Sequence, residues 1–71
     1  MAVIKAHITG NVWKVEVNVG DTVAAGDTVI ILESMKMEIP VEIEDDGGEV
    51  VAVLVKPGDA VKEGQALLEL K

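Results

Sequence analysis

The sequence has no cysteine, so its 71 residues can form neither a disulfide framework nor a thiolate metal site. Its one histidine, His7, cannot assemble a metal cluster by itself. A chain of this length buries little of its surface and supports only one small core. We therefore expect a single domain over residues 1–71 without a metal site. The lack of cysteine is compatible with a reducing, cytoplasmic setting.

Arginine is also absent, and 13 acidic residues against six lysines give a formal net charge of −7. An acidic chain without arginine binds nucleic acid and anionic membranes poorly. No apolar run is long enough to cross a bilayer, and the amino terminus lacks the long apolar region of a signal peptide. We expect a soluble, unprocessed protein whose partners include neither nucleic acid nor membrane. Its acidic charge serves solubility and can steer it toward a basic partner surface.

Aromatic residues are nearly absent, since Trp13 is the only one. The hydrophobic residues, 49% of the chain, are mainly valine, isoleucine, leucine and alanine. β-Branched residues of this kind favour strands over helices. We therefore expect a β structure in which Trp13, on the second strand, anchors the core.

The second half of the chain repeats the first. When the sequence is shifted by 38 residues, nine of the 24 residues from 10 to 33 meet an identical residue. The matching residues of the first copy are Gly10, Val12, Val15, Val17, Gly20, Asp21, Val23, Gly26 and Leu32. Glycines and aspartates that stay in register in this way indicate two copies of one supersecondary unit.

Each copy alternates short apolar segments with glycine-containing turns. In the first copy we expect strands at 11–17, 22–23 and 28–33, because no segment has the apolar spacing of a helix. The Gly-Asp pairs at 20–21 and 58–59 are expected to form turns, since glycine accepts a positive φ and aspartate binds turn amides. Phosphate-binding glycine spacings are missing, so we give these pairs a structural role.

Neither copy can close a core alone, and the two together predict an all-β fold. We expect a flattened β-barrel or sandwich of two antiparallel sheets related by a quasi-two-fold axis. The repeat halves are about 1–33 and 48–71, and between them lie the Lys36 hairpin, its following strand and a solvated acidic turn at 44–48. The expected core comprises Val12, Val15, Val17, Val23, Val29, Ile31 and their partners in the second copy.

A tight hairpin is expected between the copies. Strands at 28–34 and 37–44 leave only Met35 and Lys36 to connect them, which pushes Lys36 outward. The turn lacks the Asn-Gly or Asp-Gly that favours two-residue hairpins, so we expect function to have selected its residues. A catalytic lysine needs an apolar pocket or a second cation nearby, and the sequence around Lys36 predicts neither. Lys36 is therefore better suited to be modified by an enzyme than to act as one.

Residues 33–38 read Glu-Ser-Met-Lys-Met-Glu, with the tip lysine between two methionines. This motif closely resembles the attachment site of the biotinyl/lipoyl attachment domain family, and Pro40 and Val41 after it also resemble the family pattern. The resemblance covers nearly the whole chain. One departure is at residues 6–10, where the family often carries prolines and this chain has Ala-His-Ile-Thr-Gly. We interpret His7 there as a structural substitute.

The resemblance implies a barrel fold and a carrier function without catalysis. A biotin protein ligase would join biotin covalently to Lys36, and the modified chain would carry a carboxyl group from a biotin carboxylase to a carboxyltransferase. Those enzymes would be separate polypeptides, and the isolated carrier is expected to be a monomer. The residues implied in recognition by the ligase and its partners are Glu33, Ser34, Met35, Met37 and Glu38.

Two other functions remain open at this point. Lipoyl domains resemble the same barrel but typically place aspartate before the lysine and alanine after it, where this chain has methionines. Lipoate attached to Lys36 by a lipoate ligase would make the chain a carrier of a 2-oxo acid dehydrogenase or glycine-cleavage system. An unmodified interaction module is the third reading, but it leaves the lysine between two methionines without a purpose.

Overall fold

A computed structural model describes residues 2–44 and 46–71, and in this part of the chain all regular structure is β. The strands are β1 (Ala2–Lys5), β2 (Gly10–Val15), β3 (Thr22–Val23), β4 (Thr28–Ser34), β5 (Met37–Glu42), β6 (Gly48–Val53), β7 (Ala60–Val61) and β8 (Ala66–Leu70). Every strand pair is antiparallel. Across these two ranges no helix is both long and apolar enough to traverse a membrane.

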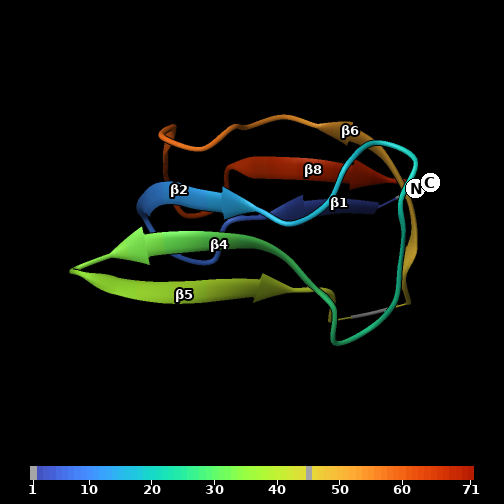
Figure 1. Ribbon diagram of the computed structural model, residues 1–71, viewed down its shortest axis with the longest axis horizontal. Coiled ribbons are helices and arrows are strands. Elements are labelled where there is room, and N and C mark those ends of the chain that lie inside the picture. The colour runs from blue at the N-terminus through green and yellow to red at the C-terminus, as the bar shows by residue number, and fades with distance from the viewer. Residues whose placement is uncertain (1, 45) are drawn as a thin grey trace.

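The strands form two four-stranded sheets, in the orders β1-β8-β6-β3 and β5-β4-β2-β7 (Figure 1). The predicted flattened all-β barrel of two antiparallel sheets is confirmed. Each sheet takes its short edge strand from the other copy of the repeat, because β3 pairs with β6 and β7 pairs with β2. The two copies are therefore joined by backbone pairing as well as by a shared core.

The 38-residue repeat superposes β2 on β6, β3 on β7 and β4 on β8. The strand registers also make β5 equivalent to β1. Leu32 faces Ile39 of β5, and its counterpart Leu70 faces Ala2 of β1. The symmetry is broken at the ends of these strand pairs. β4 and β5 continue into a hairpin, whereas β8 and β1 end near the two termini, at the opposite end of the molecule (Figure 1).

The Gly-Asp turns connect one half to the other. Gly20 donates its N–H to the carbonyl of Val50, and the N–H of Val50 donates to the carbonyl of Asp21, both at 2.8 Å. The Asp21 carboxylate accepts the N–H of Asn18 at 2.8 Å. The second Gly-Asp turn makes the same pair of bonds to Val12. Both glycines have a φ near +97° (+98° and +96°), so the structural role predicted for these turns is confirmed.

β-Bulges at equivalent positions in the two copies curve both sheets. Val12 faces Leu32 and Lys14 faces Ile31, which leaves Trp13 without a partner on β4. Val12 is buried, and the extra residue at the bulge leaves Trp13 46% exposed on the outside. The prediction that Trp13 anchors the core is therefore wrong.

A further bulge decides which β4 residues enter the core. Thr28 faces Glu42 and Ile30 faces Val41, so Val29 is the extra residue and both Val29 and Ile30 are fully buried. Ile31 consequently lies half-buried on the outer face, and its predicted place in the core is wrong. The buried residues are Ala6, Val12, Val17, Val23, Val29, Ile30, Leu32, Val41, Ile43, Val50, Val55, Val61, Leu67, Leu68 and Leu70. Val15 is half-buried and packs against them.

Two predicted strands are too long by two residues each. β2 ends at Val15 instead of residue 17, and β5 ends at Glu42 instead of residue 44. After Glu42 the chain leaves its partner strand, because Ile43 exchanges backbone hydrogen bonds with the turn at Gly26 and Asp27. Asp45, in the acidic turn predicted at 44–48, lies outside the described residues.

Candidate attachment site

The β4–β5 hairpin has the two-residue turn that the sequence predicts. Ser34 faces Met37 in the last strand pair, so only Met35 and Lys36 form the loop. Their φ angles are +52° and +66°, and positive values at both positions define the twist-matched hairpin turn of type I′. In the described residues these are the only non-glycine residues with positive φ. An ordinary L-residue in this region costs on the order of 1–2 kcal/mol.

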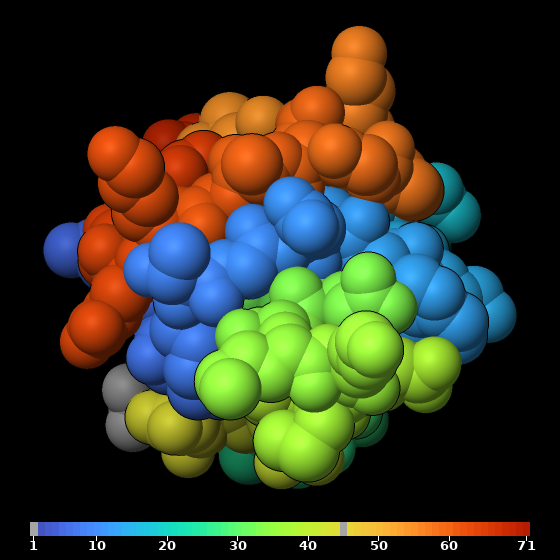
Figure 2. All heavy atoms as spheres, turned by 90° about the vertical axis from the view of Figure 1, so that its left-hand side faces the viewer, coloured from blue at the N-terminus to red at the C-terminus, as the bar shows by residue number. Residues whose placement is uncertain are grey.

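The side chains at the tip extend into solvent. Met35 is 91% exposed and Met37 60% exposed, and Lys36 is exposed between them. Figure 2 views the molecule from this end, with the hairpin projecting toward the viewer. Within residues 2–44 and 46–71 the Lys36 ammonium group makes no ion pair or hydrogen bond. Lys36 is thus a primary amine that a second protein can reach from several directions.

The predicted recognition residues are all in this hairpin. Glu33 and Glu38 face each other across the strands, and both are exposed. Ser34 is half-buried at the end of β4. The structure therefore brings the six residues of the motif together on one protruding element.

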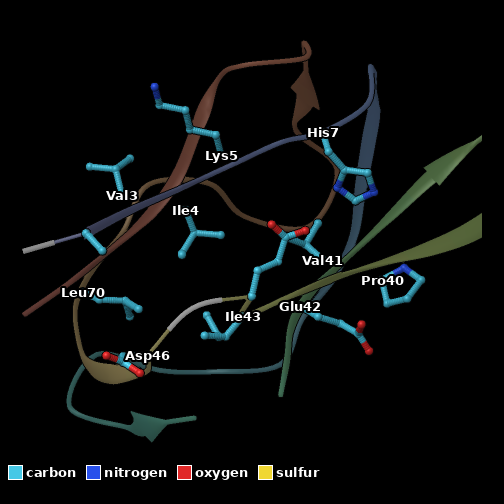
Figure 3. Close-up of a pocket in the computed structure, with 12 residues that line it drawn as sticks. Val3, Ile4, Lys5, His7, Pro40, Val41, Glu42, Ile43, Asp46 and Leu70 are labelled. Atoms are coloured by element: carbon cyan, nitrogen blue, oxygen red, sulfur yellow. The ribbon is translucent and has the colours of Figure 1, made fainter. Parts of the chain in front are cut away.

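Lys36 lines neither of two hollows found in the described residues. The larger one, about 670 Å³, lies between the edge strands β1 and β5, and among its lining residues are Ile4, His7, Val41 and Ile43 (Figure 3). In the described ranges no three histidine, aspartate or glutamate residues are close enough together to hold a metal ion. Lys36 is therefore a solvent-exposed amine outside both hollows.

Comparison with known families agrees with this geometry. The family described as "Biotin-requiring enzyme", which covers biotin and lipoyl domains, matches residues 2–70. The chain belongs to this family. The resemblance seen in the Glu-Ser-Met-Lys-Met-Glu motif is thereby confirmed.

Among the relatives of this family member, a Bacillus subtilis biotin/lipoyl attachment protein is 51% identical over 67 residues, covering 94% of this chain and 90% of the relative. The alpha3 subunit of a biotin-dependent acyl-coenzyme A carboxylase from Mycobacterium leprae is 43% identical over 96% of the chain. The chain spans only 11% of that subunit. The family thus includes both small proteins and domains of large carboxylases.

Solved structures of related domains have the same fold. The urea carboxylase of Kluyveromyces lactis matches 99% of this chain with a TM-score of 0.90 and 38% identity, and the match covers 6% of that enzyme. The lipoyl domain of the Azotobacter vinelandii 2-oxoglutarate dehydrogenase complex matches 89% of the chain and 78% of its own length, with a TM-score of 0.73. Its 24% identity shows a common fold alone.

Sequence reasoning did not find the outer face of the sheet that adjoins the tip. Glu16, Ile31 and Pro40 line a hollow there, next to Glu38. The bulge in β4 makes this surface hard to predict from sequence. Strict alternation from Val29 places Ile31 in the core, whereas the bulge turns Ile31 to the outer face. The adjacent run of four apolar residues, Val29 to Leu32, is the one local signal that alternation fails at this place.

Proposed function

We propose that the chain is a biotin carrier, with Lys36 as the residue to which biotin is joined. The observation that carries the proposal is the exposed lysine at the tip of a two-residue hairpin, in a chain of the biotin-requiring family. Proteins similar to this chain are named as carboxylases of acyl-coenzyme A and of urea, which favours biotin over lipoate. The methionines on both sides of Lys36 also favour biotin, because lipoyl domains typically have aspartate and alanine at these positions. The chain is a carrier and not a catalyst.

The chemistry of Lys36 fits this attachment. In the active site of a biotin protein ligase, the deprotonated amine of Lys36 attacks the carboxyl group of biotin, which the ligase has activated as an adenylate. An amide bond forms, and AMP leaves. Because the hairpin projects from the barrel, Lys36 can enter the active site of a second protein. When bound, biotin supplies the ureido nitrogen that carries a carboxyl group.

The partners follow from this function. A biotin carboxylase would load the carboxyl group, and a carboxyltransferase would remove it, both from polypeptides other than this one. Tethering at Lys36 replaces diffusion of the free cofactor with an effective concentration of roughly millimolar order. The carrier is a monomer in isolation and works in the cytoplasm under this proposal.

The test is the intact mass of the protein purified from its own cells, with peptide mapping. We expect a biotinyl increment on Lys36 that disappears in Lys36→Arg and persists in Lys56→Arg, a control at an exposed lysine of the same barrel. A lipoyl increment on Lys36 would replace biotin by lipoate in the proposal. An unmodified chain, in cells that biotinylate and lipoylate other proteins, would contradict the carrier function.

A further inference from the structure

One outer sheet surface leads directly to the Lys36 hairpin, and we call it the tip face. Its side chains form three rows across β4, β5 and the segment made of β2 and the next residue, Glu16; the strand registers and the residues lining one hollow define these rows. The rows are Asn11, Glu33 and Glu38; then Lys14, Ile31 and Pro40; then Glu16, Thr28 and Glu42. The first row lies beside the tip, and the other two extend away from it.

The tip face carries four carboxylates and one ammonium group. Its lysine, Lys14, lies 3.6 Å from Glu16 and neutralises only that carboxylate. Glu33 and Glu38 are direct cross-strand partners, and like charges in such a pair destabilise a sheet. This surface therefore concentrates negative charge at some expense to the fold.

The internal repeat allows this charge pattern to be compared with the other sheet, whose strands have the same backbone arrangement at equivalent positions. By strand register, Glu33 corresponds to Lys71 and Glu42 to Lys5. By the 38-residue shift, Glu16 corresponds to Leu54. The fold thus accepts cationic or neutral residues at these positions. A requirement of folding does not explain the carboxylates of the tip face.

A shallow hollow of about 360 Å³ lies in the middle of the tip face. Ile31 and Pro40 face each other across β4 and β5 and form its apolar part, while Glu16 and Glu38 lie at its rim. Ile31 is half-buried and lines this hollow, and its counterpart in the other sheet is Glu69. Because the fold accepts glutamate at the equivalent position, it does not require an apolar side chain at residue 31.

We propose that the tip face is the docking surface for the biotin protein ligase that modifies Lys36. The ligase surface that fits it is basic, to match the four carboxylates, and places an apolar side chain over Ile31 and Pro40. This inference rests on the proposed function. The ligase is the occupant because it must bring its active site within one lysine side chain of the hairpin and so contacts the adjoining sheet. Enzymes that act on the bound cofactor are held further away by its arm.

Charge-neutralised variants of the whole chain test this proposal. The variant Glu16→Gln/Glu38→Gln/Glu42→Gln removes three carboxylates from the tip face. The control Glu49→Gln/Glu63→Gln/Glu69→Gln removes three from elsewhere, with the same change in net charge. The probe is the biotin protein ligase from the same cells, and kcat/KM for biotinylation is measured at low and high salt.

We expect the tip-face variant to lower kcat/KM about tenfold or more at low salt, mainly through KM, as loss of electrostatic steering does. The difference should shrink at high salt, where exposed charges are screened. The control should stay within about twofold of the wild type. Equal kcat/KM values for the two variants would overturn the proposal. Failure of the proposed function is a different result, since the wild-type chain would then not be biotinylated at all.

The apolar part has its own test. Ile31→Gln is compatible with the fold because a polar residue, Glu69, occupies the equivalent position. Its control is Val3→Gln on the other sheet, at an exposed position equivalent to Pro40. We expect Ile31→Gln to raise KM for biotinylation at high salt as well as at low salt, and Val3→Gln to leave it unchanged. An unchanged KM in Ile31→Gln would exclude the hollow from the docking surface.

Discussion

Met35 and Lys36 have a backbone conformation that their side chains disfavour. Asparagine and glycine would form the same turn at lower cost, and both residues here have positive φ. Met35, at the first turn position, is 91% exposed, so burial of its side chain does not offset the energetic cost of this backbone conformation. Under the proposed function, recognition by another protein accounts for these residues, at a cost in stability at the tip.

Substitution Met35→Asn separates these two requirements. Asparagine tolerates a positive φ, so we expect the free energy of unfolding in urea to rise by about 0.5–1 kcal/mol. This corresponds to a melting temperature higher by a few degrees, roughly 2–8 °C for a domain of this size. Biotinylation by the ligase should slow, because the thioether is lost. Met37→Asn is the control, since it lies in β5, where asparagine gives no such gain. A less stable Met35→Asn would contradict the turn assignment.

At the scale of strands and turns, the bulges and the inter-half hydrogen bonds determine where each side chain points. The bulge at Trp13 recurs at Val51 in the second copy, where Val50 faces Leu70 and Ala52 faces Glu69. Both sheets therefore curve in the same way, although a large aromatic occupies one position and valine the other. The curvature belongs to the backbone pairing and does not depend on the bulged side chain.

Gly47 and Gly20 are required for different reasons, close packing of two backbone segments at Gly47 and a positive φ in a turn at Gly20. A Cβ at Gly47 would lie 1.7 Å from the Val23 carbonyl oxygen, so Gly47→Ala must displace β3. A Cβ at Gly20 would meet nothing within 4 Å, and only its φ of +98° opposes Gly20→Ala. We expect Gly20→Ala to lower the free energy of unfolding by about 1–2 kcal/mol. Gly47→Ala should cost more, about 3 kcal/mol or above, as steric overpacking with backbone movement does. Equal losses in urea titrations would contradict this ranking.

At the scale of the whole molecule, the two halves depend on each other. β3 completes the sheet of the second half and β7 that of the first, and one continuous core contains residues from both. The charge distribution, in contrast, departs from this symmetry. Carboxylates gather on the sheet that bears Lys36, while Lys5 and Lys71 lie at equivalent positions on the other. A symmetric scaffold thus has its hairpin at one end and most of its outward-facing strand carboxylates on one of the two sheets.

This interdependence predicts that neither half folds alone. Peptides comprising residues 1–44 and 46–71 should each give the circular dichroism spectrum of an unfolded chain. The first lacks β7 and the two strands that pair with β1 and β3, the second lacks β1 and β3, and each has only part of the core. The whole chain, at about 0.05–0.15 kcal/mol per residue, has a stability of roughly 4–10 kcal/mol, too little to survive that loss. Mixing the peptides should restore β structure. Dispersed amide resonances from either peptide alone would contradict the prediction.

The sequence by itself determined the features that depend on local chemistry and on the repeat. These are the two β units, the glycine turns with their aspartates, the two-residue hairpin and the exposed lysine between methionines. Each follows from a short pattern whose physical meaning is local: alternation gives strands, glycine permits positive φ, and a tip residue has no partner. The family resemblance rested on the same hairpin.

Only the tertiary structure decided which residues face inward beyond a bulge, how the halves exchange β3 and β7, and which charges share a surface. Trp13 and Ile31 show the reason. One unpaired residue reverses the alternation of a strand, and its position depends on pairing with a segment distant in sequence. The tip face has the same origin, since Glu16, Ile31 and Pro40 become neighbours only when three strands align.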